Sequence, residues 1–332
     1  MPAEACPADV GLVSVGGLVL VPVDFSPHAR AAAVRACELA RACEARVRLI
    51  HGVDAPDRAA PGPEAKAPAA GAAADDRPAG RPGEPASARE DRPTRTLEAW
   101  CAELAGRAPR ISASVEQEDP VALIARHVQA EDVMLVVMGM HGFHDVSRMF
   151  FGSVADRALR TTRVPMMLVK ENERDASTRI RRILLATDFS RASEHALCLA
   201  IHWARRLEAD VEVLHAIQDP EEEPRYRRPR DSASRSARQR ANALEGLRSI
   251  LSRSAAAGVR AVADLTYGSP SVEIVKHAAR ARADLVVMGL RDRAAGSAGG
   301  YGSVTERVIR HAKCSVLVAP EDDRIELWPV SG

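Results

Sequence analysis

Short apolar runs alternate along the chain with longer segments in which apolar residues recur at helical spacing. The runs at residues 19–23 and 183–186 each precede such a segment. In the second segment, one face carries Ala196, Ala200, Trp203 and Leu207. The runs at 134–138 and 285–288 are apolar throughout, which is typical of strands covered on both faces. This alternation predicts an α/β fold built on a parallel sheet with right-handed crossovers.

The alternation occurs twice because the chain repeats itself. The segment VPVDFSPHARAAAVRACELA recurs 164 positions later as LATDFSRASEHALCLAIHWA. Blocks nearer the end of each copy are separated by only 150 positions, as are Pro120 and Pro270, so the first copy carries 14 extra residues. We therefore expect two tandem domains, residues 1–174 and 175–332, each with a doubly wound parallel sheet.

The extra residues lie in a segment of unusual composition. Of the 40 positions from 54 to 93, 25 are Ala, Pro or Gly, and large apolar side chains are few. Such a segment buries too little surface to offset its ordering entropy, so we expect a disordered insertion at about 54–93. Helices are predicted after it near 96–107 and, in the second copy, at 241–257. A polar linker is predicted at 171–179.

Charge and composition exclude several classes of protein. The 332 residues carry 46 Lys and Arg against 45 Asp and Glu, a net charge of +1, so we expect neither nucleic acid nor a membrane as partner. The apolar stretch at 10–23 is too short to span a membrane and lacks a basic flank. None of the six cysteines has CxxC spacing, which argues against a cysteine zinc site and fits a reduced, cytoplasmic setting.

The strongest candidate chemistry follows the apolar run at 134–138. Gly139 and Gly142 come first, and Gly152-Ser153 follows after nine further residues. Glycines at a strand end let backbone N–H groups approach an anion without a Cβ in the way. A helix that begins at Gly152-Ser153 also presents unpaired N–H groups and its positive dipole end. Together these features predict a phosphate cradle that contains no lysine.

Each of these features also has a purely structural interpretation. Ser153 begins a sequence that resembles a capping box, and Ser303 begins a true one, Ser-Val-Thr-Glu. The carboxylate of Asp24 could close a turn or cap a helix, because a Ser-Pro pair follows shortly after it. His51 and His215 follow buried runs at equivalent positions, where we expect packed or hydrogen-bonded histidines. Spacing alone leaves the phosphate cradle and the structural interpretation open.

The order strand, Gly-x-x-Gly-x9-Gly-Ser, helix, with an Asp at the end of the first strand, resembles the universal stress protein family. The resemblance covers both copies and nearly the whole chain outside the insertion. It implies a Rossmann-like fold of the adenine-nucleotide alpha-hydrolase type. In that family one branch binds ATP through the full glycine motif, and another branch lacks the motif and does not bind ATP.

The resemblance also implies roles for individual residues. Val23 and Asp24 would lie beside the adenosine, and Gly52 would present its backbone to the adenine edge. The ribose and the triphosphate, neutralised by Mg²⁺, would be surrounded by Gly139, Gly142, Gly152, Ser153 and Val154. The equivalent set in the second copy is Thr187, Asp188, Ala216, Gly289, Gly302, Ser303 and Val304.

The second copy departs from the motif at one position. Asp292 stands where the second glycine belongs, and its carboxylate would repel a phosphate while its Cβ blocks close approach. Arg291 and Arg293 could partly offset that charge, so an impaired site and an ordinary one both stay open. Our hypothesis is an asymmetric pair, with one nucleotide-binding half and one structural half.

Three functions remain in competition. The first is an ATP-binding stress-response module, in which any ATP hydrolysis should be slow because no nucleophile, lysine or general base accompanies the motif. The second is a stress-related interaction scaffold that binds no nucleotide. The third is an enzyme, for which the His-Gly-Phe-His segment at 141–144 has the wrong order of residues. The resemblance also implies that the last strands, at 164–170 and 314–320, could pair within one chain as a pseudo-dimer; whether two chains associate further stays open.

Overall fold

The computed structural model describes residues 16–53, 86–140, 152–170, 179–218, 232–290 and 302–321. The elements of the first half are β1 (Leu18–Pro22), α1 (Pro27–Cys43), β2 (Arg46–Gly52), α2 (Ala86–Leu104), β3 (Arg110–Glu116), α3 (Pro120–Ala130), β4 (Val133–Gly139), α4 (Ser153–Thr161) and β5 (Met166–Val169). Those of the second half are β6 (Arg182–Ala186), α5 (Arg191–Leu207), β7 (Asp210–Ile217), α6 (Ser232–Ala256), β8 (Ala261–Tyr267), α7 (Pro270–Ala281), β9 (Leu285–Leu290), α8 (Ser303–His311) and β10 (Ser315–Pro320).

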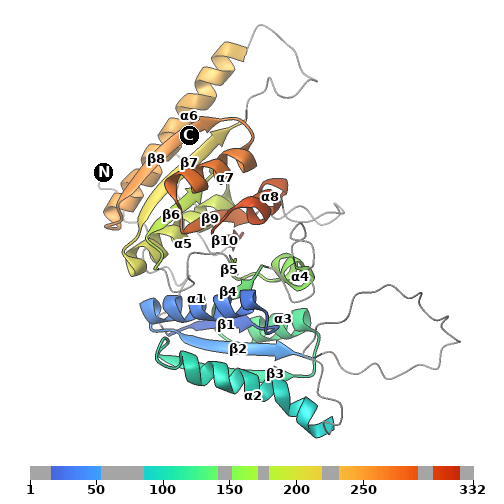
Figure 1. Cartoon of the computed structure of the whole chain (residues 1–332). Helices are drawn as coiled ribbons and strands as arrows, with labels where there is room; N and C mark the ends of the chain where they lie inside the picture. The colour runs from blue at the N-terminus through green and yellow to red at the C-terminus, as the bar shows by residue number, and fades with distance from the viewer. Residues whose placement is uncertain are drawn as a thin grey trace, which may run out of the picture.

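Within the described residues ten strands form one sheet, in the order β3-β2-β1-β4-β5-β10-β9-β6-β7-β8 (Figure 1). Neighbouring strands are parallel except β5 and β10, which run antiparallel with Val316 opposite Leu168. The predicted α/β fold with two repeated, mostly parallel halves is confirmed. The predicted pairing of the two last strands within one chain is confirmed as well.

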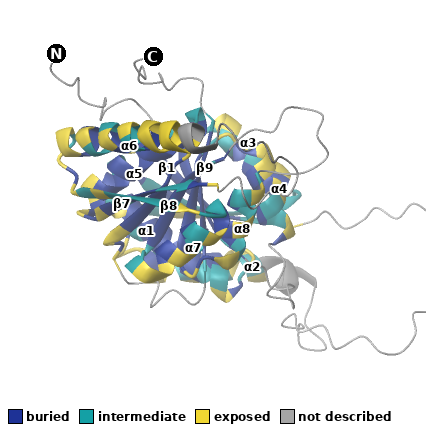
Figure 2. Ribbon diagram, turned by 90° about the horizontal axis from the view of Figure 1, so that it is seen from above, coloured by how far each residue is buried: buried dark blue, intermediate teal, exposed yellow. Residues whose placement is uncertain are grey.

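Helices cover both faces of the sheet. On one face α1, α2, α5 and α6 pack against alternate strand residues such as Val19 and Val21. On the other face α3, α4, α7 and α8 pack against the intervening residues, such as Leu18 and Leu20. The strands are therefore apolar at consecutive positions, as strands covered on both faces must be. Figure 2 shows the buried strands between helices whose outer surfaces are exposed.

The first helix of each half begins in the same way. The Ser26 hydroxyl accepts a hydrogen bond from the N–H of Ala29 at 3.1 Å, and Pro27 occupies the first helical turn of α1. Ser190 is the equivalent N-cap of α5. An N-cap serine satisfies an amide that has no acceptor within the helix, and proline there lacks the N–H that would need one. Both helices therefore leave the carboxyl ends of β1 and β6 at defined points.

Two helices begin earlier than the apolar pattern predicts. α2 begins at Ala86 and contains Pro93, so the end of the predicted disordered insertion is helical and that expectation is wrong for residues 86–93. α6 begins at Ser232, nine residues before its predicted start. Residues 236–242 of α6 are exposed and carry no apolar periodicity, so only the later turns, which pack on the sheet, were visible in the pattern. Residues 54–85 lie outside the described part of the chain.

No helix among the described residues combines the length and the apolar character that crossing a membrane requires.

Candidate functional site at the carboxyl edge of the sheet

The predicted site residues of the first half that the structure describes lie at the carboxyl ends of β1, β2 and β4. The N–H of Val23 donates to the carbonyl of Ile50 at 2.8 Å, which joins the ends of β1 and β2. The N–H of Gly152 donates to the carbonyl of Met140 at 3.1 Å, which places the start of α4 at the end of β4. The strand order reverses between β1 and β4, the usual place for a ligand in an open α/β sheet.

The carboxylate of Asp24 has a structural contact. Its Oδ1 accepts a hydrogen bond from the N–H of Ser26 at 3.0 Å, and the intervening Phe25 has a φ of 64°. Asp188 accepts from the N–H of Ser190 at 3.0 Å in the same way. The predicted turn role of Asp24 is thus confirmed. A bulky side chain in the left-handed region is uncommon, so this turn is a constrained conformation that occurs in both halves.

The histidines after the second strand of each half hold these turns. His51 Nδ1 lies 2.6 Å from the carbonyl oxygen of Val23, and His215 Nδ1 lies 2.8 Å from that of Thr187. Because a carbonyl only accepts, Nδ1 carries the proton in both rings. Each ring also contacts the left-handed phenylalanine, with centroids 4.6 Å apart for Phe25 and His51. The prediction of hydrogen-bonded histidines is confirmed.

Packing alone requires some of the glycines. A Cβ on Gly139 would lie 2.8 Å from the backbone carbon of His28, and one on Gly289 would lie 2.4 Å from that of Ala192. Helices α1 and α5 cross β4 and β9 too closely for any other residue there. Likewise, a Cβ on Gly52 would lie 2.7 Å from the carbonyl oxygen of Glu118. The first glycine of the motif is therefore explained by helix packing in both halves.

The glycine before α8 is different, because a Cβ on Gly302 would meet no atom of the described residues within 4 Å. Neither a positive φ nor close packing requires glycine at this position, whose φ is −50°. Since no described residue fills the space beside Gly302, an incoming group could approach the backbone there.

Helices α4 and α8 do not begin as capping boxes. Their N-cap residues are Gly152 and Gly302, and neither helix has a side-chain capping bond. Ser153 and Ser303 are the first helical residues, and both are exposed. The capping-box expectation is wrong because that motif needs its Ser or Thr one position earlier, at the N-cap itself.

The first turn of α4 fits an anion. Its first intrahelical bond runs from the N–H of Asp156 to the carbonyl of Gly152 at 2.9 Å. In the described part of the chain no group accepts from the N–H of Ser153 or Val154, which point out of the positive end of the helix dipole. The carboxylate of Asp156 is paired with Arg160 at 2.9 Å, which offsets its charge. These residues therefore suit a phosphate group.

The equivalent turn of the second half is held more tightly. Ser193 Oγ donates to Asp188 Oδ1 at 2.5 Å and accepts from the N–H of Asp188 at 3.1 Å. Ala29 stands at the equivalent position of the first half and has no hydroxyl. Sequence reasoning missed this difference, although the serine is visible when the two copies are aligned. Asp188 is thereby engaged by both a backbone amide and a hydroxyl.

Part of the glycine motif lies outside the described residues. Gly142 is not described, and neither is the His-Gly-Phe-His segment at 141–144. In the second copy, Asp292, Arg291 and Arg293 are likewise not described. The proposed asymmetry at the second glycine therefore stays a prediction.

Comparisons with known proteins agree on one family. The model of the universal stress protein family matches residues 18–170 and again 179–320. A universal stress protein of Methanocaldococcus jannaschii is 29% identical over 147 residues, 44% of this chain and 85% of its own length. A Staphylococcus epidermidis protein named for the same family is 30% identical over 148 residues, 44% of this chain and 87% of its own length.

Two solved structures extend over nearly the whole chain. A universal stress protein from Archaeoglobus fulgidus has a TM-score of 0.56 at 17% identity and covers 92% of this chain and 98% of its own. A functionally unknown protein from Pseudomonas aeruginosa has a TM-score of 0.63 at 15% identity, with 94% and 95% covered. At such identities the likeness shows the fold, here the tandem arrangement of both halves.

Proposed function

Because the chain belongs to the universal stress protein family over most of its length, we propose that it is an ATP-binding stress-response module with its nucleotide site in the first half. The observation that carries the proposal is the uncapped start of α4, whose Ser153 and Val154 amides face the edge where β1, β2 and β4 end. A helix N-terminus at a strand-order reversal is a favourable place for phosphates.

The proposal assigns two groups of residues. Val23, Asp24 and Gly52 lie at the ends of β1 and β2 and would border the adenosine. The ribose and phosphates would be held by Gly139, Gly142, Gly152, Ser153 and Val154. Mg²⁺ would be carried on the phosphates, since this set offers amides and hydroxyls to an anion rather than a cluster of carboxylates to a metal.

The second half is proposed to be the altered site. Thr187, Asp188, Ala216, Gly289, Gly302, Ser303 and Val304 repeat the arrangement. Asp292 would oppose phosphate, and the Ser193 contact to Asp188 reduces that carboxylate's freedom to turn toward a ligand. One ATP per chain follows from this asymmetry.

The proposal includes the organisation of the molecule. We place the boundary between the two domains after residue 174, between β5 and β6. A cytoplasmic location is proposed from the family and from the five described cysteines, none of which is in a disulfide. Nucleotide binding would act by shifting a conformational or partner-binding equilibrium, since the glycine motif itself contains no lysine or general base for phosphoryl transfer.

A scaffold that binds no nucleotide is the second candidate. One observation favours it: close helix packing alone accounts for Gly139 and Gly289, so these glycines need no ligand to explain them. The scaffold would use the continuous ten-stranded sheet as a rigid platform.

Isothermal titration of the full chain with Mg-ATP separates the two candidates. We expect saturable binding of one ATP per chain, its loss in Gly142→Asp, and a second site in Asp292→Gly. Gly106→Asp is the matched control, because Gly106 lies before β3 at the opposite edge of the sheet and a Cβ there would meet no described atom within 4 Å. A folded wild-type chain that binds no ATP at millimolar concentration would leave only the scaffold.

A further inference from the structure

Three metal-binding side chains converge on the second half, away from the carboxyl edge. Glu212 of β7, Asp264 of β8 and His277 of α7 each place one ligand atom within 4.8 Å of the others. His277 Nε2 lies 2.8 Å from Asp264 Oδ2 and 3.8 Å from Glu212 Oε1. The His277 side chain is only 7% exposed. Packing against neighbouring residues therefore fixes the position of its ring.

A positive group of the chain itself stands among these atoms. One guanidinium nitrogen of Arg280 contacts His277 Nε2 and lies 3.1 Å from Asp264 Oδ2 and 3.9 Å from Glu212 Oε1. Nε2 cannot donate to the carboxylate and accept from the guanidinium in one protonation state. One of these two contacts of Nε2 is therefore not a hydrogen bond. The guanidinium nitrogen of Arg280 occupies the place where a cation meets the ligand atoms of Glu212, Asp264 and His277. That side chain is 66% exposed, so it can leave for water without burying a charge.

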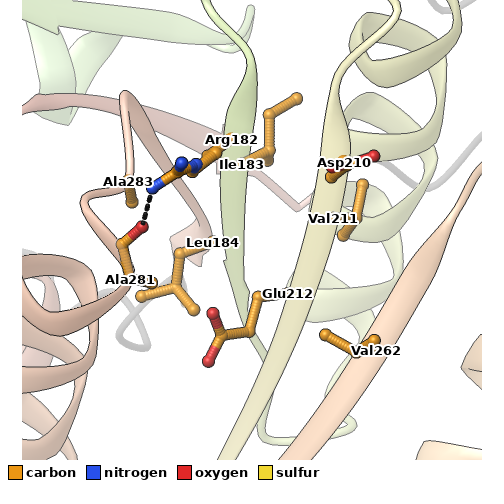
Figure 3. Close-up of a pocket in the computed structure, with 9 residues that line it drawn as sticks. All are labelled: Arg182, Ile183, Leu184, Asp210, Val211, Glu212, Val262, Ala281 and Ala283. Atoms are coloured by element: carbon orange, nitrogen blue, oxygen red, sulfur yellow. Dashed lines mark hydrogen bonds between the residues drawn. The ribbon is translucent and has the colours of Figure 1, made fainter.

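A cavity adjoins the cluster. It has a volume of about 120 Å³, and Glu212 lines it together with Arg182, Leu184, Val262 and Ala281. Figure 3 shows the Glu212 carboxylate on the cavity side of β7, turned toward Leu184. A volume of this size has room for water, which a metal ion with three protein ligands needs to complete its coordination.

The equivalent place in the first half is a closed ion network. His127 Nδ1 lies 2.6 Å from Glu131 Oε1, and its Nε2 lies 3.0 Å from Glu116 Oε1. Each of those carboxylates also pairs with an arginine, Glu131 with Arg48 and Glu116 with Arg126. Both ring nitrogens of His127 are therefore already engaged, and every carboxylate has its own counter-ion.

Four substitutions between the copies open this network. Along the aligned copies Arg48 becomes Glu212, Ser114 becomes Asp264, Glu116 becomes Thr266, and Glu131 becomes Ala281. A cation is replaced by a carboxylate, a carboxylate is added beside the histidine, and the loss of a long side chain at Ala281 leaves the cavity. The second half thus retains the buried histidine. In place of the closed ion network of the first half, it has three convergent metal-binding side chains.

We propose that Glu212, Asp264 and His277 bind a divalent transition-metal ion of the Zn²⁺ class, which displaces the guanidinium of Arg280. One imidazole and two carboxylates are ligands that Zn²⁺ accepts, with water in the remaining position. Since the ligands come from β7, β8 and α7, the bound metal would fasten this helix to the outer strands of the second half. The site is independent of the nucleotide proposal, because its residues lie on the face of the sheet.

The full chain, freed of metal with a chelator, should be titrated with Co²⁺ and followed by its visible absorption, with Zn²⁺ as competitor. We expect one Co²⁺ per chain, d–d bands without a thiolate charge-transfer band, and loss of binding in His277→Gln. His127→Gln is the matched control and should bind as the wild type does. Arg280→Gln removes the competing cation and should tighten binding by roughly two- to fivefold, the range of an exposed ion pair.

Three outcomes would overturn the site. They are binding that persists in a folded His277→Gln chain, a thiolate charge-transfer band, and the absence of binding from both the wild type and Arg280→Gln. Circular dichroism of each variant distinguishes a lost ligand from a lost fold. Because Arg280→Gln alters an exposed side chain and predicts a gain, the proposal remains testable even where His277→Gln unfolds.

Discussion

Glu194 of α5 accepts a hydrogen bond from Arg253 of α6 at 2.6 Å, and the equivalent pair in the first half has its charges exchanged. There Arg30 of α1 pairs with Glu103 of α2. The side chains of Glu194 and Arg253 are 18% and 10% exposed, against 28% and 65% for Arg30 and Glu103. Each half therefore joins its first two helices by an ion pair of opposite polarity, and the pair of the second half is the more buried.

Loss of one partner should matter more in the second half. Glu194→Gln removes the carboxylate that pairs with the buried guanidinium of Arg253, so we expect a loss of about 1–3 kcal/mol in the free energy of unfolding. Glu103→Gln should lose less than about 1 kcal/mol, because its pair is exposed. Urea unfolding curves measure both. The double variant Glu194→Arg, Arg253→Glu should recover part of the loss, and equal losses in both halves would contradict this account.

Stability should depend on pH through His202. Burial, with Arg206 and Arg205 nearby, lowers the pKa of His202 from 6.5 to about 4. The unfolded chain takes up this proton below pH about 6.5 and the folded chain only near pH 4, so stability should fall as the pH drops between these values. The contribution of this one group is at most about 3 kcal/mol.

Urea unfolding at pH 7.5, 5.5 and 4.5 tests the contribution of His202, with His202→Gln beside the wild type. The variant should lose less stability on acidification than the wild type does. His311→Gln, at an exposed histidine of α8, is the control and should follow the wild type. Parallel curves for His202→Gln and the wild type would be inconsistent with a depressed pKa.

The glycines of the motif should separate into two kinds. Gly139→Ala places a Cβ 2.8 Å from the backbone of His28, so we expect a loss of about 1–3 kcal/mol from overpacking. Gly302→Ala meets no atom of the described residues within 4 Å and should leave the fold unchanged. Thermal unfolding monitored by circular dichroism distinguishes them. A stable Gly139→Ala chain would show that helix α1 can move away from β4.

Lys170 should contribute to the contact between the halves. Its Nζ donates to the carbonyls of Ala312 and Arg310, at the carboxyl end of α8 in the other half. A cation there satisfies unpaired carbonyls and the negative dipole end, so Lys170→Met should lower the free energy of unfolding by about 1–2 kcal/mol. Lys313→Met, at an exposed lysine just after α8, should stay within about 0.5 kcal/mol of the wild type. Equal effects in urea unfolding would contradict the prediction.

Some local contacts could be predicted because they lie close in sequence. The Ser-Pro pair after Asp24 predicted both the turn and the start of α1, and the structure contains the Asp24 contact to Ser26. The histidines at 51 and 215 were predicted as hydrogen-bonded from their equivalent places in the repeat. The starts of α2 and α6 were not predicted, because those turns carry few apolar residues on which a pattern could rest.

Other features depend on segments that are distant in the chain. The close approach of α1 to β4 explains Gly139, yet His28 and Gly139 are separated by most of the first half. The neighbours of Ser153 predicted that it caps α4, but the backbone dihedrals of Gly152 make that glycine the N-cap. The cluster of Glu212, Asp264 and His277 was not foreseen at all, since its members come from three separate elements.

The sequence by itself determined the repeat, the alternation of strands and helices and the α/β class, because these follow from the periodicity of burial along each segment. Tertiary structure alone decided which charged side chains face each other on the single sheet that β5 and β10 join. The physical reason is that periodicity records whether a residue is buried, whereas a contact depends on which distant surface buries it.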